Sequence, residues 1–290
     1  MQFCVILLVL ASFAYAENAH ESVDNSAYGY HTKIGIPLAE SIRDVEQSLG
    51  SRIIGGVPAA IGQYPFKAGI IGDIVGLNAV SVCGGALISP NRVATAAHCW
   101  NDGQNQAWRL TIVLASTTIF SGGTRVSSSA VATHPSWSPV LARNDVAVVY
   151  LASDVPISRN IAPIALPSGN ELFENFVGQQ AIALGYGITR DGDSLNAGLT
   201  LNHVRLNVIG NNVCNIAYPL LIQISNICTS GIGSVGICSG DSGGPLITTR
   251  NNRHILIGVS QFRSPVGCES GLPSVFSRVT SFMDFFNSHL

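Results

Sequence analysis

The chain has 290 residues, a formal charge of −2 and only 11% charged residues, against roughly 25% in an average soluble protein. No run of basic residues appears, which argues against a nucleic-acid partner. At this length the chain can bury a sizeable core and could form one or two domains.

Residues 1–16 have the pattern of a signal peptide. An apolar centre is followed by Ala14-Tyr15-Ala16, a small-residue cleavage site, although no positive charge precedes it. A membrane anchor would need about 18 or more apolar residues, and this stretch is shorter. We therefore expect a secreted, extracellular protein with no membrane segment.

Residues 17–52 are richer in acidic than in basic side chains and contain no cysteine. Within them apolar residues recur at helical spacing, between Pro37 and Gly50: Leu38, Ile42, Val45 and Leu49. Two interpretations remain open, a short amphipathic helix lying on the body of the protein or a solvated linker.

From Ile53 onward, short β-type runs alternate with Gly, Pro, Asn and Ser, as in β-sandwiches and barrels. The clearest runs are 107–114, 124–131, 146–151, 180–184, 203–209 and 254–259. Only the C-terminus has a helical pattern, with Val279, Phe282, Met283 and Phe286 on one face. A proline-containing stretch between Leu151 and Leu166 is where we expect the chain to divide.

The sequence GICSGDSGGP at 236–245 surrounds Ser242 with glycines. Serine needs a nearby base and a site for the oxyanion to act as a nucleophile. The backbone N–H groups of Gly240 and Ser242 are the candidate oxyanion donors. A surface turn is the plain alternative. A G-x-S-x-G nucleophile elbow needs an acid, a histidine and helix–strand repeats after the serine. The short stretch that follows Ser242 has no room for such repeats, so the elbow is excluded.

Two further motifs precede this one, TAAHC around His98 and NDVAVV around Asp145. In the order histidine, aspartate, serine, the three motifs resemble those of the chymotrypsin-like serine proteases, over residues 53–290. The resemblance implies an all-β fold of two six-stranded antiparallel β-barrels packed together, with a C-terminal helix. It implies Ser242 as nucleophile, His98 as general base and Asp145 as the residue that orients the histidine.

The run Arg52-Ile53-Ile54-Gly55-Gly56 is similar to the activation junction of this family. The resemblance makes residues 17–52 an activation pro-segment that another protease cuts after Arg52. The freed amine of Ile53 would then pair with the carboxylate of Asp241.

Six of the seven cysteines follow the signal peptide, an even number that allows 15 pairings. The resemblance implies three disulfides, Cys83–Cys99, Cys214–Cys228 and Cys238–Cys268. A zinc site is the alternative, but the chain has no C-x-x-C pair. We expect no metal and no cofactor.

The same resemblance places Gly236 and Ser274 at the base of the specificity pocket and Arg263 on its wall, where relatives have glycine. Without a carboxylate at the base, cleavage after Lys or Arg should be poor. Two outcomes are open for Arg263. If its side chain points into solvent, which we favour, an apolar pocket remains for Leu, Phe or Tyr. If it folds inward, the pocket is short and positively charged, and small or acidic residues gain. Gln261 stands where relatives have a serine that supports the aspartate. The sequence from Cys268 to Thr280 is similar to the arthropod brachyurin, or serine collagenase, branch.

Two functions are therefore considered. The first is the secreted zymogen of a serine endopeptidase that acts on proteins or peptides as a monomer and that protein inhibitors bind, with chymotrypsin- or collagenase-like specificity. The second is a weakly active or inactive homologue that acts as a binding protein. This possibility stays open because Gln261 and Arg263 depart from the residues that active relatives have at these positions.

Overall fold

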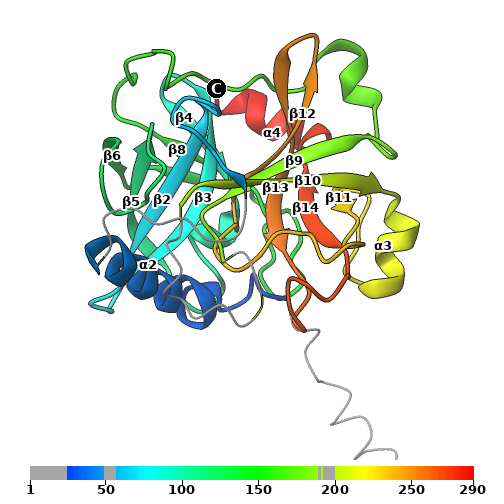
Figure 1. The fold of residues 1–290 in the computed structure, drawn as a ribbon, viewed down its shortest axis with the longest axis horizontal. Coiled ribbons are helices and arrows are strands. Elements are labelled where there is room, and N and C mark those ends of the chain that lie inside the picture. Colours follow the sequence, from blue (N-terminus) through cyan, green and yellow to red (C-terminus); the bar gives the residue numbers. More distant parts are fainter. Residues whose placement is uncertain (1–24, 49–56, 189–190, 192–199) are drawn as a thin grey trace, which may run out of the picture.

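A computed structural model describes residues 25–48, 57–188, 191 and 200–290. The expected signal peptide and the expected activation junction at Arg52 and Ile53 lie outside the described residues. Two antiparallel β-sheets pack side by side (Figure 1), and among the described residues no helix is long and apolar enough to cross a membrane.

The first sheet is built from the first half of the chain and has the strand order β6-β5-β2-β3-β4-β8-β7. Its long central strands are almost entirely buried, because both faces are covered. The strands are β2 (Lys67–Ile74), β3 (Val80–Ser89), β4 (Arg92–Thr95), β5 (Ala107–Leu114), β6 (Thr124–Ser128), β7 (Val131–Thr133) and β8 (Ala147–Tyr150).

The second sheet closes into a barrel of six strands, since β9 pairs with both β10 and β12. The short strand β1 (Val57–Pro58) extends it by pairing with β10. The barrel strands are β9 (Gln180–Gly185), β10 (Asn202–Ile209), β11 (Asn226–Thr229), β12 (Pro245–Arg250), β13 (Arg253–Phe262) and β14 (Ser274–Arg278). The chymotrypsin-like, all-β fold is thus confirmed.

The first sheet differs from the expected closed barrel, because it is a half-barrel whose end strands β6 and β7 do not pair in the described structure. The run expected at 124–131 bends after Ser128 instead of continuing as one strand. The Ser128 hydroxyl donates to the carbonyl of Tyr150 at 2.5 Å, and the backbone N–H of Tyr150 donates to the carbonyl of Ala130. The chain therefore crosses from one edge of the sheet to the other at 129–130, and this connection replaces a strand pairing.

The C-terminal helical segment follows the second barrel in sequence and contacts both halves: its first turn lies against β13, and Phe282 and Phe285 pack on His134 of the first half. It consists of η4 (Val279–Phe282) and α4 (Met283–Ser288), and Phe286 is fully buried. Arg92 donates to the carbonyl of His289 at 2.8 Å. This segment and the stretch between β8 and β9, which includes η3 (Gly169–Phe173), connect the two halves. A further helix, α3 (Asn211–Ala217), lies on the second barrel.

Residues 25–48, which we call the N-terminal segment, form the π-helical turn η1 (His31–Gly35) and the helix α2 (Ile36–Ser48). Leu38, Ile42 and Val45 are all buried, and α2 packs against β3 of the first sheet (Figure 1). The amphipathic-helix interpretation is therefore correct and the solvated linker is wrong for these residues.

Candidate active site

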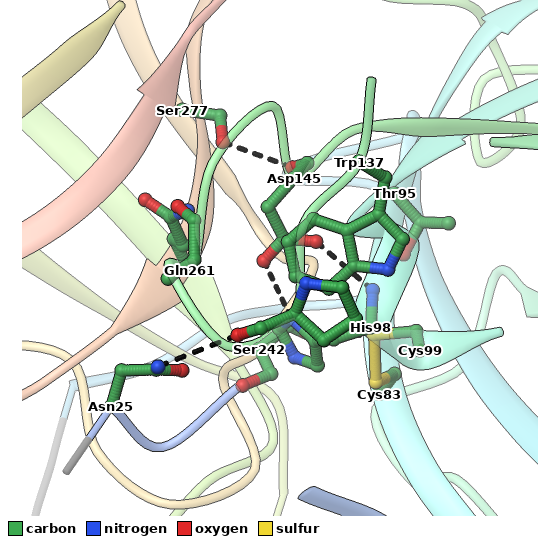
Figure 2. Close-up of polar contacts among 12 residues, drawn as sticks. Asn25, Cys83, Thr95, His98, Cys99, Trp137, Asp145, Ser242, Gln261 and Ser277 are labelled. Atoms are coloured by element: carbon green, nitrogen blue, oxygen red, sulfur yellow. Dashed lines mark hydrogen bonds and ion pairs between the residues drawn. A yellow bond between two sulfur atoms is a disulfide. The ribbon is translucent and has the colours of Figure 1, made fainter. Parts of the chain in front are cut away.

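His98 and Asp145 form a doubly hydrogen-bonded pair between two elements of the first sheet. His98 lies in η2 (Ala97–Cys99), directly after β4, and Asp145 lies just before β8. One carboxylate oxygen accepts the backbone N–H of His98 at 2.9 Å, and the other lies 2.7 Å from Nδ1 (Figure 2). An ionised carboxylate only accepts, so Nδ1 carries the proton and Nε2 is left as the basic nitrogen.

The loop that carries Asp145 is braced by the second barrel. The hydroxyl of Ser277 on β14 donates to the Asp145 carbonyl at 2.9 Å (Figure 2). Gln261 on β13 donates to the carbonyl of Ala142 and accepts from Asn226 at 2.8 Å. Gln261 does not hydrogen-bond the Asp145 carboxylate in the described structure, but it supports the same loop through the backbone.

Ser242 lies in a tight loop between the two sheets, and its side chain is 9% exposed. Its carbonyl accepts the N–H of Gly84 at 2.7 Å, and the N–H of Gly243 donates to Ser260 at 2.8 Å. Gly243 has φ +76°, and a Cβ there would lie 2.4 Å from Thr95 Oγ1 and 2.5 Å from the Gly84 carbonyl oxygen. Only glycine fits beside the nucleophile candidate at this close approach of the two halves.

Three disulfides fix the segments around these residues. They are Cys83–Cys99, Cys214–Cys228 and Cys238–Cys268, the pairs that the resemblance implies. The first ties η2, with His98, to β3. The third spans 30 residues and holds the chain four residues before Ser242 to the loop between β13 and β14. Their sulfurs are covalently paired and offer no thiolate to a metal.

The Asp241 carboxylate lies against the end of β9, where a Cβ placed on Gly185 would be 1.7 Å from its Oδ1. Its two oxygens accept the N–H groups of Gly187 at 3.0 Å and Cys238 at 2.7 Å. Desolvation raises the pKa of this carboxyl above its usual range, against the effect of those two donors. A cavity of about 450 Å³ lies beside it and is also lined by Gly236.

The residues predicted to form the base of the specificity pocket are adjacent. A Cβ on Gly236 would lie 2.7 Å from the hydroxyl oxygen of Ser274, which accepts the N–H of Ile237 at 3.0 Å. Among the described residues no carboxylate lies between these two positions, although Asp241 and Glu269 line the same cavity. The position of Gly236 therefore leaves a neutral, hydrogen-bonded floor.

The expectation that Arg263 points into solvent is wrong. Its guanidinium is half-buried and donates to the hydroxyl of Ser239 at 2.8 Å and to the Ser264 carbonyl at 2.6 Å. These two acceptors replace the water that a fully exposed guanidinium would bind. The cation therefore lies against the loop that leads to Ser242, three residues before it.

Comparison with known proteins decides the family. A family model described as trypsin matches residues 53–286. The chain belongs to the trypsin family.

Among curated trypsin-family relatives, a collagenase from Hypoderma lineatum is 38% identical over 82% of the chain and 87% of the relative. Brachyurin from Leptuca pugilator is 33% identical over 81% of the chain and 97% of the relative. A solved structure named HL collagenase has a TM-score of 0.73 at 36% identity and covers 82% of this chain and 98% of its own. The expected family, the arthropod collagenase branch and the serine-type endopeptidase activity are confirmed.

Two parts of this trypsin-family site were missed by the sequence analysis. Lys67 on β2 is 3% exposed, donates to the Ala68 carbonyl at 2.8 Å and lies over the ring of Tyr186. Burial lowers its pKa to about 7, opposed by the charge of Asp241. A lysine at the start of the strand, directly before the apolar run 68–71, was the available signal.

The other is Tyr30 of the N-terminal segment, which is fully buried with its ring centroid 4.8 Å from that of His98. Nothing in the sequence around Tyr30 marks it as a partner of the site. The Nε2 atom of His98 is buried and has no hydrogen-bond partner among the described residues.

Proposed function

We propose that this serine endopeptidase is made as a secreted zymogen and acts through His98, Asp145 and Ser242. The supporting observation is the fully buried His98–Asp145 pair, in which the carboxylate holds the Nδ1 proton and leaves Nε2 basic. The buried carboxylate of Asp102 accepts three backbone N–H groups and makes no hydrogen bond to His98, which leaves Asp145 as the proposed partner.

In the proposed mechanism, Ser242 Oγ attacks the scissile carbonyl while Nε2 of His98 takes its proton. The N–H groups of Gly240 and Ser242 receive the oxyanion, and His98 returns the proton to the leaving amine. Water then hydrolyses the acyl-enzyme by the same route, and Asp145 stays ionised throughout. These roles are those of the family template, carried to this chain by its motifs and supported by its geometry.

Turnover of a peptide substrate by single and double variants tests this mechanism. Ser242→Ala and His98→Ala should each lower kcat by several powers of ten, and the double variant should be little worse, because the residues act as a unit. Losses that add in the double variant would contradict a shared mechanism.

Activation is proposed to follow a cut after Arg52, which frees Ile53 to pair with Asp241. Asp241 supports this role because its two oxygens are held by backbone N–H groups beside a 450 Å³ cavity. Burial makes the negative charge of Asp241 unfavourable unless a cation lies beside it. A cationic amine that entered the cavity would supply that cation. Three disulfides are consistent with secretion into an oxidising compartment.

Primary specificity is proposed to exclude Lys and Arg. The pocket base offers Gly236 and Ser274 with no carboxylate, and the guanidinium of Arg263 lies against Ser239 at 2.8 Å, close to the catalytic loop. A cationic substrate side chain would be repelled and left unpaired. With Arg263 held inward, small and acidic side chains gain over bulky apolar ones, and profiling of a mixed peptide library measures this order.

A further inference from the structure

The N-terminal segment lies on the catalytic residues themselves. Tyr30 is fully buried, its ring packs on that of His98, and its hydroxyl donates to the carbonyl of Val82 at 2.7 Å. Burial raises the pKa of this hydroxyl, and the nearby Ser242 side chain acts in the opposite direction. Tyr30 thus packs on the base and lies beside the nucleophile proposed above, and the Nε2 atom of His98 makes no hydrogen bond to any described residue.

The helix α2 covers the proposed oxyanion site as well. Leu38, in its first turn, is 2% exposed, and a Cβ placed on Gly240 would lie 2.2 Å from Leu38 Cδ2. Leu38 thus packs directly against the backbone of Gly240 and fills space that a substrate approaching this donor would need. Two side chains of one segment therefore block the base, the nucleophile and one oxyanion donor.

Polar contacts fix the segment at three separate places on the first half of the chain. Asp102 accepts the backbone N–H of His31 at 2.7 Å. The Asn25 amide donates to the carbonyl of Val140 at 2.9 Å.

The third place is Glu46, near the end of α2. Its carboxylate accepts the N–H of Ile119 at 2.8 Å and that of Phe120 at 3.1 Å, together with the hydroxyl of Ser121 at 2.7 Å. Between the three places, Ala39 and Ile42 are fully buried.

The backbone of the segment is helical where it meets the catalytic residues. Tyr30 has φ −52° and ψ −45°, and η1 and α2 follow it without a break. Proteins that bind peptides along a strand edge hold them extended, so that the main-chain groups can pair. A helical turn does not present a peptide bond in that way, so the segment blocks the cleft without being positioned for cleavage.

We propose that the N-terminal segment is a ligand of the catalytic cleft that remains bound after the activating cut. This inference rests on the proposed cut after Arg52 and on the proposed catalytic residues. All of the contacts described above lie between residues 25 and 46, on the N-terminal side of that cut. Because residues 17–52 contain no cysteine, the cut leaves a peptide held only by non-covalent contacts. The cut chain becomes active when this peptide leaves or is degraded.

The test uses a labelled synthetic peptide of residues 25–48 and the trypsin-cut chain after removal of its own segment by gel filtration. Binding is measured by fluorescence anisotropy on the Ser242→Ala chain, and inhibition is measured on the wild-type chain. We expect competitive inhibition. Tyr30→Ala in the peptide should raise Kd and Ki about 30-fold or more, as loss of a central buried aromatic does. Glu40→Gln, on the exposed face of α2, is the matched control and should change neither.

Prior reaction of Ser242 with a bulky phosphonate should also weaken peptide binding to the wild-type chain, because both ligands occupy the cleft. No binding, or equal binding of the Tyr30→Ala and unchanged peptides, would overturn the inference. A cut chain that binds the peptide but neither hydrolyses substrates nor reacts with the phosphonate would leave this inference standing and contradict the proposed function instead.

Discussion

The carboxylate of Asp145 binds His98 twice, at its backbone N–H and at Nδ1, with distances of 2.9 Å and 2.7 Å. Asp145→Asn replaces one accepting oxygen by an NH₂ group, which favours a proton on Nε2 instead of Nδ1. We expect kcat to fall by about 10⁴-fold, the value of the family template, with little change in Tm. A kcat within tenfold of the wild type would show that His98 does not need this partner.

We expect the uncut chain to be latent and its activation to depend on Arg52. Arg52→Ala should stay inactive after trypsin treatment, because no Ile53 amine is freed to pair with Asp241. In the cut wild type the pairing should raise the pKa of this amine above its free value of about 8. Activity that depends on it is then retained below pH 8 and lost as the pH rises through the raised value. Full activity of the Arg52→Ala chain would contradict the activation scheme.

Substrate choice should change when the guanidinium of Arg263 is removed. Arg263→Gly removes the hydrogen bond to Ser239 and takes a positive charge from the proposed pocket wall. We expect kcat/KM for bulky apolar residues to rise by about tenfold and that for acidic residues to fall. Cleavage after Lys and Arg should remain poor, since the pocket base gains no carboxylate. A library profile dominated by Lys and Arg in either chain would show that the pocket is assigned to the wrong residues.

Affinity for the peptide of residues 25–48 should fall in acid. Burial lowers the pKa of His31 to about 4, against about 6.5 when free, with Asp102 opposing the shift and His98 adding to it. The bound state therefore favours the neutral ring. The contribution of His31 to the affinity of the peptide is fully present above pH 6.5. Below that pH the affinity should fall by up to about tenfold per pH unit toward pH 4, roughly 100-fold in all.

Anisotropy titrations from pH 7.5 to pH 4 measure this fall. A peptide with His31→Gln has no ring to protonate, so most of its pH dependence should disappear. An unchanged profile in that peptide would show that another group controls release.

Stability of the fold should depend on the buried amine of Lys67. Its pKa is about 7 in the folded chain and about 10.5 in the unfolded chain, so the folded state loses its proton first. The free energy of unfolding should rise by about 1.4 kcal/mol per pH unit between pH 7 and pH 10. Lys67→Met should remove this pH dependence. The matched control is Lys33→Met, which changes the other, exposed lysine and should keep it. Denaturant titrations of the Arg52→Ala chain at several pH values measure the difference.

Motifs and strand patterns predicted the family, the fold class and most strands, because they depend on local chemistry. The run at 107–114 coincides with β5, and the apolar face of residues 38–45 predicted a helix. The pattern could not show which surface this helix covers, since many apolar surfaces fit one apolar stripe. Tyr30 was missed for this reason.

The remaining differences come from tertiary contacts. The half-barrel depends on a bend at 129–130 that is fixed by Ser128 and Tyr150, which lie 22 residues apart. Solvation argues for an exposed Arg263, but Ser239 and the Ser264 carbonyl provide acceptors that the sequence pattern does not reveal. In the same way, Gln261 supports the loop of Asp145 through Ala142, a contact between positions 119 residues apart.

The most direct test of the catalytic account is reaction of the cut chain, freed of the N-terminal segment, with a phosphonylating serine probe, followed by mass mapping. We expect one phosphonate per chain, on Ser242 Oγ, and no phosphonate in either Ser242→Ala or His98→Ala. Absence of labelling in the wild type, or labelling that persists in Ser242→Ala, would contradict it and favour a protein that binds without cleaving.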